Sequence, residues 1–229
     1  MLSIAICDDD IQTTGKMESI IQKMAKQNLV NIETEVFWDG KSLVDAIINK
    51  NNFDLIYLDI EMDKEDGIYR GFDEELGWGK YRVKCEGELG WFGGVYELPV
   101  TTLEELAHFF QKELKMEVVQ LVGDPKMTVK RVSVLVGGGS LGLGQENLPM
   151  RHMHQENIDV AICGDITEWT LSAYVRDASQ MGMNKGMLVL GHERSEECGM
   201  KHLPAWLKSI TGDLPVTFVD AKEPFLYIK

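Results

Sequence analysis

The sequence has few cysteines, and they lie far apart. Its four cysteines form no C-x-x-C pair, so the sequence indicates neither a zinc knuckle nor a disulfide framework, and we expect buried thiols of a reducing compartment. The sequence also lacks any run of 18 apolar residues, and its start is not a basic segment followed by an apolar one. These absences predict a cytoplasmic protein with no membrane span and no signal peptide.

Basic residues are also scarce. Lysine and arginine together number 23 against 37 acidic residues, which gives a net charge of −14 and makes binding to nucleic acid unfavourable. Residues 1–68 hold 14 acids and six lysines, whereas residues 69–229 hold 23 acids and 17 bases. The acid excess is concentrated in the shorter segment, so we expect two unlike parts. The 44% hydrophobic content is enough to fill a core, and the strand and helix patterns below predict an α/β protein.

The first part alternates predicted strands with predicted helices. Apolar strands are expected over Leu2–Cys7, Ile32–Trp38 and Phe53–Leu58, with amphipathic helices between them. This order predicts a parallel βαβαβ unit, in which ligands lie beyond the carboxyl ends of the strands. Three aspartates follow the first and third strands: Asp8, Asp9 and Asp59. Converging carboxylates suit Mg²⁺, and the metal would let one of them accept a phosphoryl group.

These residues resemble a known family. The run Ile-Ala-Ile-Cys-Asp8-Asp9, followed by Phe-Asp-Leu-Ile-Tyr-Leu-Asp59, is similar to the receiver domain of bacterial response regulators, especially the LytTR-type subgroup. The resemblance implies that Asp59 is the phosphoacceptor and that Asp8 and Asp9 bind Mg²⁺. It covers about three of five strand–helix units, and the later Ser or Thr and Lys are not found. We therefore predict a truncated receiver-like segment over residues 1–68.

Residues 69–229 return to alternating strands and helices after a stretch rich in glycine and aromatic residues, which we expect to serve core and turn packing. A helix should begin near Leu103, with Thr101 or Thr102 as its cap and Glu104 or Glu105 completing a capping box. Two further helices are expected over Thr170–Met181 and from Ser195 to Leu207. The predicted strands are Arg82–Cys85, Gly94–Leu98, Val118–Val122, Val129–Val136, Ile158–Cys163, Met187–Leu190 and Val216–Asp220.

A glycine-rich turn follows one of these strands. Its residues are Gly137, Gly138, Gly139 and Ser140, and such a turn can present backbone N–H groups to an anion. The alternative is an ordinary tight turn, because the motif lacks the Lys-Ser/Thr of a P-loop. His152 and His154 lie close together, and we interpret them as surface or helix residues.

A histidine and a glutamate lie four residues apart where another strand meets a helix. If helical geometry includes His192, this residue and Glu196 project from one face, and they are suitable ligands for a borderline divalent metal. The alternative is a turn histidine beside a glutamate that interacts with the helix N-terminus. Asp165 and Glu168 follow the neighbouring strand end.

Several of these features appear in the order of a second family. They include Gly90-Trp-Phe-Gly93, Asp159-Val-Ala-Ile-Cys-Gly-Asp165 and Gly191-His192-x-x-Ser195-Glu196. This part resembles the Nif-three-like dinuclear-metal proteins, often labelled type 2 GTP cyclohydrolase I homologues, over about residues 72–229. The resemblance implies that His192 and Glu196 bind Zn, Mn or Fe, and that the chain forms a homo-oligomer. In a metal-dependent hydrolase of this kind, Asp165 and Glu168 would support the ligands or face the substrate. Gly137–Ser140 would bind the phosphate of a phosphorylated or nucleotide-like molecule.

The chain departs from this family in its N-terminal part. The family's His-His-Pro motif and a further aspartate ligand are not found, so the predicted dinuclear site is incomplete, with Asp59 or Glu61 as conceivable replacements. We therefore predict a receiver-like segment over residues 1–68 fused to a Nif-three-like portion over residues 69–229. Metal-dependent hydrolysis is the first functional hypothesis. Signalling through Asp59, or a gene-fusion product without selected activity, are the alternatives.

Overall fold

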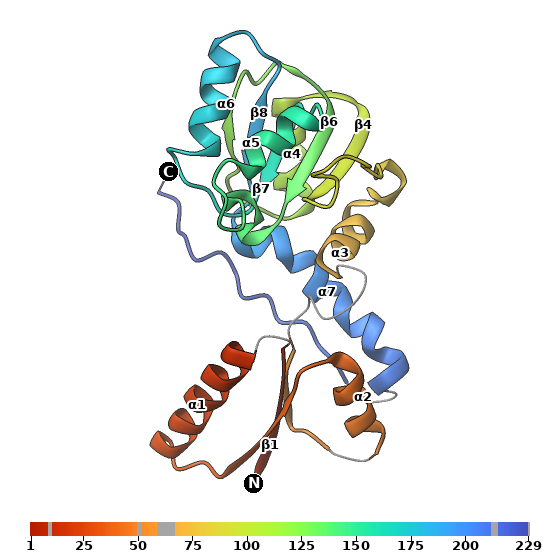
Figure 1. Cartoon of the computed structure of the whole chain (residues 1–229), viewed down its shortest axis with the longest axis vertical. Helices are drawn as coiled ribbons and strands as arrows, with labels where there is room; N and C mark the ends of the chain where they lie inside the picture. The colour runs from red at the N-terminus through yellow and green to blue at the C-terminus, as the bar shows by residue number, and fades with distance from the viewer. Residues whose placement is uncertain (9–10, 50–51, 59–66, 212–214, 229) are drawn as a thin grey trace. The chain divides into compact units, whose positions relative to one another are not determined.

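A computed structural model of the chain describes residues 1–8, 11–49, 52–58, 67–211 and 215–228, with the backbone alone for 209–211. The described chain divides into two compact units. Unit 1 comprises residues 1–67 with 209–212, and unit 2 comprises residues 68–208 with 213–229. Figure 1 shows the elements of both units. The α/β class predicted from the sequence is confirmed.

Unit 1 contains a three-stranded parallel sheet in the order β2-β1-β3. Helices α1 and α2 lie on opposite sides of this sheet (Figure 1). The α2 helix begins after Asp39, whose side chain accepts a hydrogen bond from the Ser42 amide. A small core joins the sheet to α2. The elements are β1 (Leu2–Cys7), α1 (Ile11–Gln27), β2 (Ile32–Phe37), α2 (Gly40–Ile48) and β3 (Leu55–Leu58). The three predicted strands are present, with small differences at their ends.

Unit 2 is built around a five-stranded mixed sheet in the order β4-β6-β7-β8-β5. The three central strands are parallel, and the two edge strands are antiparallel to their neighbours. The strands are β4 (Gly94–Thr102), β5 (Gln120–Val122), β6 (Thr128–Leu135), β7 (Val160–Cys163) and β8 (Gly186–Val189). The helices are α3 (Gly67–Leu76), α4 (Leu103–Glu113), α5 (Leu148–Gln155), α6 (Leu171–Gln180) and α7 (His192–Thr211), with short 3-10 turns η2 (Gly79–Tyr81) and η3 (Gly137–Leu141).

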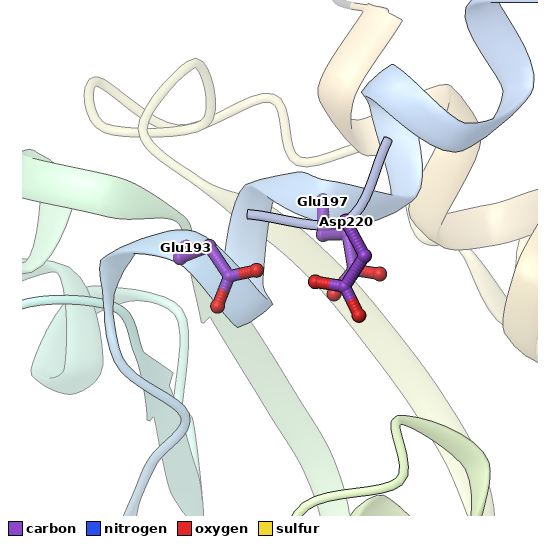
Figure 2. A group of neighbouring side chains, drawn as sticks. All are labelled: Glu193, Glu197 and Asp220. Carbon is purple, nitrogen blue, oxygen red and sulfur yellow. The ribbon is translucent and has the colours of Figure 1, made fainter. Parts of the chain in front are cut away.

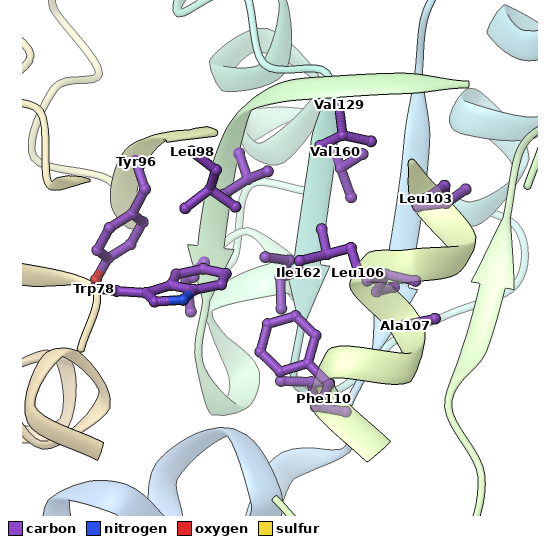
Figure 3. Packing of buried hydrophobic residues seen from close by; sticks show 14 of the residues in the cluster. Trp78, Tyr96, Leu98, Leu103, Leu106, Ala107, Phe110, Val129, Val160 and Ile162 are labelled. Carbon is purple, nitrogen blue, oxygen red and sulfur yellow. The ribbon is translucent and has the colours of Figure 1, made fainter. Parts of the chain in front are cut away.

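Two apolar layers cover the sheet of unit 2. Figure 3 shows the first, in which α4 packs Leu103, Leu106 and Phe110 against Val160 and Ile162 of β7. The second layer joins the sheet to α5 and α6 through side chains that include Met153, Leu171 and Val175. Burial of these apolar surfaces is the main driving force for the fold. Because helices cover the sheet, the central strands read as continuous apolar runs.

The aromatic residues of the glycine-rich stretch pack largely as predicted. Phe72, Trp78, Phe92 and Tyr96 are buried, and Trp78 meets Tyr96 edge to face with ring centroids 5.4 Å apart. Trp91 is the exception, since about two thirds of it is exposed (65%).

Two predicted strands are absent from the described structure. Residues 82–85 make only an isolated bridge, from Arg82 to Tyr96, and the Arg82 guanidinium pairs with Asp73 at 2.8 Å. Residues 216–220 form no strand, and their Asp220 lies 3.6 Å from Arg194 of α7. The strand predictions for these two segments were therefore wrong.

All four cysteines are free thiols; Cys7, Cys163 and Cys198 are buried as predicted, whereas Cys85 is only half-buried. Burial raises the pKa of Cys163 to about 12, so this thiol stays protonated and unreactive. No helix in the described part of the chain combines the length and apolar character needed to cross a membrane. The proposed origin of residues 1–68 and 69–229 from two different proteins stays a prediction.

Candidate metal centre

The candidate site lies at the carboxyl ends of the three parallel strands of unit 2. The turn η3 follows β6, Gly164 and Asp165 follow β7, and α7 begins directly after β8 and Gly191. In open α/β sheets this edge is where ligands bind, because the loops beyond the strand ends meet there. The structure therefore brings together two groups of predicted site residues that are far apart in the sequence.

His192 is the centre of this arrangement. Its Nδ1 atom lies 2.8 Å from Oδ2 of Asp165, and its Nε2 atom lies 3.3 Å from Oε2 of Glu196. The helix α7 starts at His192, so His192 and Glu196 occupy one face as i and i+4 residues. The hydrogen bond to Asp165 is the largest cause that raises the pKa of His192.

The distances suit a shared divalent metal ion. Two ligand atoms at about 2.1 Å from one ion and at a tetrahedral angle are about 3.4 Å apart. The separation of His192 Nε2 and Glu196 Oε2 is 3.3 Å. A ligating histidine commonly donates its other N–H to a carboxylate, and Asp165 accepts in that position. The same distances suit an ion pair when His192 is protonated, so pH distinguishes the two states.

Glu168 is placed differently. It is exposed on the loop between β7 and α6, outside the hydrogen-bonded group that the described residues Asp165, His192 and Glu196 form. Its predicted role at the site stays a prediction.

The glycine-rich turn lies against the ligand pair. Gly137 is buried with a φ of +49°, and a Cβ atom there would overlap Oε1 of Glu196. Its N–H donates to the Ser195 hydroxyl at 2.9 Å, and its carbonyl accepts from the Asp165 amide at 2.8 Å. The Ser140 hydroxyl donates to the Asp165 carbonyl.

These bonds also limit how the turn could hold an anion. The amides of Gly137 and Gly139 donate within the protein, to Ser195 and to the Val136 carbonyl. The Ser140 hydroxyl likewise donates to the Asp165 carbonyl, so a phosphate bound at this turn would need other donors. The predicted phosphate site over Gly137–Ser140 stays a prediction.

The predicted Mg²⁺ site of unit 1 is only partly described. Asp8 is half-buried directly after β1, and its amide donates to the Phe37 carbonyl at 3.1 Å. Asp9, Asp59 and Glu61 lie outside the described residues. The predicted Mg²⁺ binding and phosphorylation, and the conceivable replacement of a lost metal ligand by Asp59 or Glu61, stay predictions.

Sequence reasoning missed a group of carboxylates formed by α7 and the C-terminal segment. Glu193, Glu197 and Asp220 have oxygen atoms within 4.8 Å of one another, and Figure 2 shows this group. Arg194 lies among them, bonded to Glu197 and 3.6 Å from both Glu193 and Asp220. Burial is the largest cause that raises the pKa of Glu193. The guanidinium already supplies positive charge here, so we interpret the group as an ion-pair network.

The histidine pair lies on α5, which agrees with the helix prediction. His154 is exposed, whereas His152 is fully buried and its Nε2 atom lies 2.8 Å from the Ser133 hydroxyl. Of the two alternatives, surface or helix, His152 meets only the second, because α5 packs this side of the helix against the sheet.

Comparison with known proteins places the chain in a family. The sequence model of Duf34/NIF3 (NGG1p interacting factor 3) matches residues 8–224. The chain belongs to the Duf34/NIF3 family. The match begins inside the segment predicted to be receiver-like, and the comparisons give no support to the resemblance to response regulators. A search of curated proteins gave no match.

Several solved structures match this Duf34/NIF3 chain over part or most of its length. Protein SA1388 of Staphylococcus aureus is 24% identical with a TM-score of 0.45, and the match covers 59% of this chain and 37% of that one. A Bacillus cereus protein related to NIF3 is 18% identical with a TM-score of 0.44, over 59% and 36% of the two chains. TTHA1606 of Thermus thermophilus is 17% identical with a TM-score of 0.48, over 98% and 85%. The matched part is little more than a third of the length of the first two proteins.

Proposed function

We propose that this Duf34/NIF3 protein binds a divalent metal ion (Zn, Mn or Fe) through His192 and Glu196. The observation that carries the proposal is the geometry of these two side chains. Their nitrogen and oxygen atoms lie 3.3 Å apart, close to the separation expected for two ligands of one ion. An imidazole with a carboxylate is a ligand set that such metals accept.

Asp165 supports this role. Its carboxylate accepts from Nδ1 of His192 at 2.8 Å, which leaves Nε2 without a proton when the ring is neutral. Neutral Nε2 is the form that binds a metal. The site thus has one ligand fixed by its helix and another fixed by a hydrogen bond from the neighbouring strand end.

We further propose hydrolysis as the reaction class, with a small phosphorylated or nucleotide-like substrate and a homo-oligomeric protein. A bound metal of this kind lowers the pKa of a coordinated water and so supplies a nucleophile at neutral pH. Catalytic zinc commonly has three protein ligands, whereas the proposal names two. We therefore expect water to complete the coordination and the bound metal to exchange more readily than a structural ion.

The decisive experiment is elemental analysis of protein purified without chelator and reconstituted with Zn²⁺, Mn²⁺ or Fe²⁺. We expect about one equivalent per chain, lost in the variant His192→Ala/Glu196→Gln. The matched control is His154→Ala/Glu146→Gln, which changes an exposed histidine and an exposed glutamate of the same unit. The proposal is wrong if the wild type binds no metal, or if both double variants bind as much as the wild type.

A hydrolase screen follows only if metal is bound. Phosphate monoesters and nucleotides should be tested with metal-loaded wild type beside the His192→Ala/Glu196→Gln variant. Turnover by the wild type that the variant lacks would support the hydrolase proposal. Equal turnover by both proteins would assign it to a contaminant.

A further inference from the structure

We infer that Ser195 is a positioning residue that fixes the His192–Glu196 ligand pair against the end of β6, with Gly137 as its partner. This inference rests on the proposed metal binding and concerns residues that do not themselves contact the ion. Ser195 is only 1% exposed, although His192, three residues earlier on α7, is exposed.

The Ser195 hydroxyl has two partners. It accepts from the Gly137 amide at 2.9 Å and donates to the His192 carbonyl at 2.8 Å. One hydroxyl therefore joins the turn after β6 to the first turn of α7. Because His192 and Glu196 both lie in the first turns of α7, a bond that holds the His192 carbonyl also holds the backbone that carries both ligand side chains.

Gly137 continues the same connection to the third strand end. Its carbonyl accepts from the Asp165 amide at 2.8 Å, and the Asp165 side chain holds Nδ1 of His192. A Cβ atom at Gly164 would overlap the backbone of Gly137, so the two chain segments touch directly. The peptide of Gly137 thus links the residue that positions α7 to the residue that orients the imidazole.

This arrangement points to positioning of the ligands, beyond general packing. A buried hydroxyl elsewhere in the core would stabilise the protein without affecting a metal. Ser133 provides that comparison, because it is also fully buried and its hydroxyl lies 2.8 Å from Nε2 of His152. Both serines therefore make a buried hydrogen bond, but of the two only Ser195 is bonded to a residue of the proposed ligand pair.

The test compares the Zn²⁺ affinity of Ser195→Ala and Ser133→Ala, measured by competition with a chromophoric chelator. We expect Ser195→Ala to weaken Zn²⁺ binding about 10- to 100-fold, as loss of a group that supports a ligand does. Ser133→Ala should bind Zn²⁺ like the wild type, although its thermal midpoint falls. Ser195→Thr keeps the hydroxyl and should recover most of the affinity even if Ser195→Ala is poorly folded.

A second readout needs no metal. The Gly137 amide loses its acceptor in Ser195→Ala, so its hydrogen exchange should become faster relative to the amides of β7, whereas Ser133→Ala should leave that ratio unchanged. Equal Zn²⁺ affinity of Ser195→Ala and wild type would overturn this inference and leave the proposed function standing. No Zn²⁺ binding by the wild type would overturn both.

Discussion

The Nδ1 atom of His192 lies 2.8 Å from Oδ2 of Asp165, although the two residues are 27 positions apart. Asp165 follows β7, and His192 follows the adjacent parallel strand β8. Neighbouring parallel strands bring their carboxyl ends to one edge, so residues after each strand can meet across it. This contact converts two separate sequence features into one candidate centre and gives the first prediction.

Replacing Asp165 by Asn should weaken metal binding without removing either ligand. The substitution removes the negative charge at position 165, and a neutral amide accepts the Nδ1–H bond of His192 less strongly than a carboxylate. Loss of such a supporting group commonly reduces metal affinity about 10- to 100-fold. Competitive titration with Zn²⁺ measures the change. The control Asp177→Asn alters an aspartate on α6 whose side chain is 59% exposed, and its affinity should equal that of the wild type.

Metal affinity should rise with pH through the titration of His192. The hydrogen bond to Asp165 is the main cause that raises the pKa of His192, so the protonated ring persists above the ordinary value of about 6.5. A proton and a metal ion compete for Nε2. Zn²⁺ titrations between pH 6 and 8 should show affinity falling as the solution becomes more acidic, and in Asp165→Asn this fall should shift to lower pH.

The stability of the metal-free protein has the opposite dependence on this group. Because the folded-state pKa of His192 is raised, protonated His192 stabilises the fold below the unfolded-state pKa, and this stabilisation is lost as the pH rises through the folded-state pKa.

The outcome that would contradict ligation by His192 is an affinity for Zn²⁺ that does not change between pH 6 and 8.

The buried pair of Ser133 and His152 predicts a loss of stability in acid. Burial is the largest cause that lowers the pKa of His152, and Glu156 partly opposes it. Since the folded-state pKa is lowered, neutral His152 stabilises the fold above the unfolded-state value of about 6.5, and this contribution is lost as the pH falls through the folded-state pKa.

Urea unfolding at several pH values between 5 and 8 measures this contribution. His152→Gln should lower the free energy of unfolding at pH 8 by about 1–3 kcal/mol and flatten its decline toward pH 5. His154→Gln is the matched control, since His154 is exposed on the same helix. If both variants decline like the wild type, His152 is not the group responsible.

The sequence was most informative where one local pattern determines one local structure. Short apolar runs located β1, β6, β7 and β8. The helix that was expected from Ser195 begins three residues earlier, at His192, so His192 and Glu196 lie on one helix, which the sequence alone leaves conditional. Apolar runs and spacings of this kind are visible in a single sequence. The Duf34/NIF3 membership was likewise accessible from motifs in chain order, such as Gly191-His192 with Ser195-Glu196.

The features that were missed depend on partners distant in the sequence. Ser195 reads as an ordinary helix residue until Gly137 is seen 58 positions away. The segment 216–220 was predicted to be a strand, yet its backbone forms none and Asp220 lies beside Arg194. The burial of His152 likewise depends on the sheet, where Ser133 lies beside it. Tertiary contacts determine the structure at these residues, and the periodicity of the sequence does not reveal such contacts.

The start of α4 illustrates a local pattern that can be tested directly. Thr102 accepts from the Glu105 amide at 3.2 Å, and the Glu105 carboxylate accepts from the Thr102 amide at 3.0 Å, so the predicted capping box is confirmed. Thr102→Ala should lower the free energy of unfolding by about 1 kcal/mol. Thr102→Ser keeps the hydroxyl and should cost much less, so equal losses for the two variants would show that the methyl group matters more than the cap.

The last prediction concerns Gly137, where the backbone conformation favours glycine and an added Cβ atom would meet both ligand side chains. Its φ is +49°, a region that costs residues with a Cβ atom about 1 kcal/mol or more. The added methyl group would also overlap the Glu196 carboxylate and press on Nε2 of His192. Gly137→Ala should therefore displace the ligand pair and reduce both Zn²⁺ affinity and the thermal midpoint.

Gly138→Ala is the matched control for this change. Its added Cβ atom would meet no other atom within 4 Å, so the variant should keep the wild-type affinity for Zn²⁺ and nearly the same thermal midpoint. Because the two glycines are adjacent in one turn, a general intolerance of the turn would affect both variants equally. A selective loss in Gly137→Ala would instead show that the backbone after β6 must approach the His192–Glu196 pair closely for the metal to bind, and wild-type affinity in Gly137→Ala would contradict that close approach.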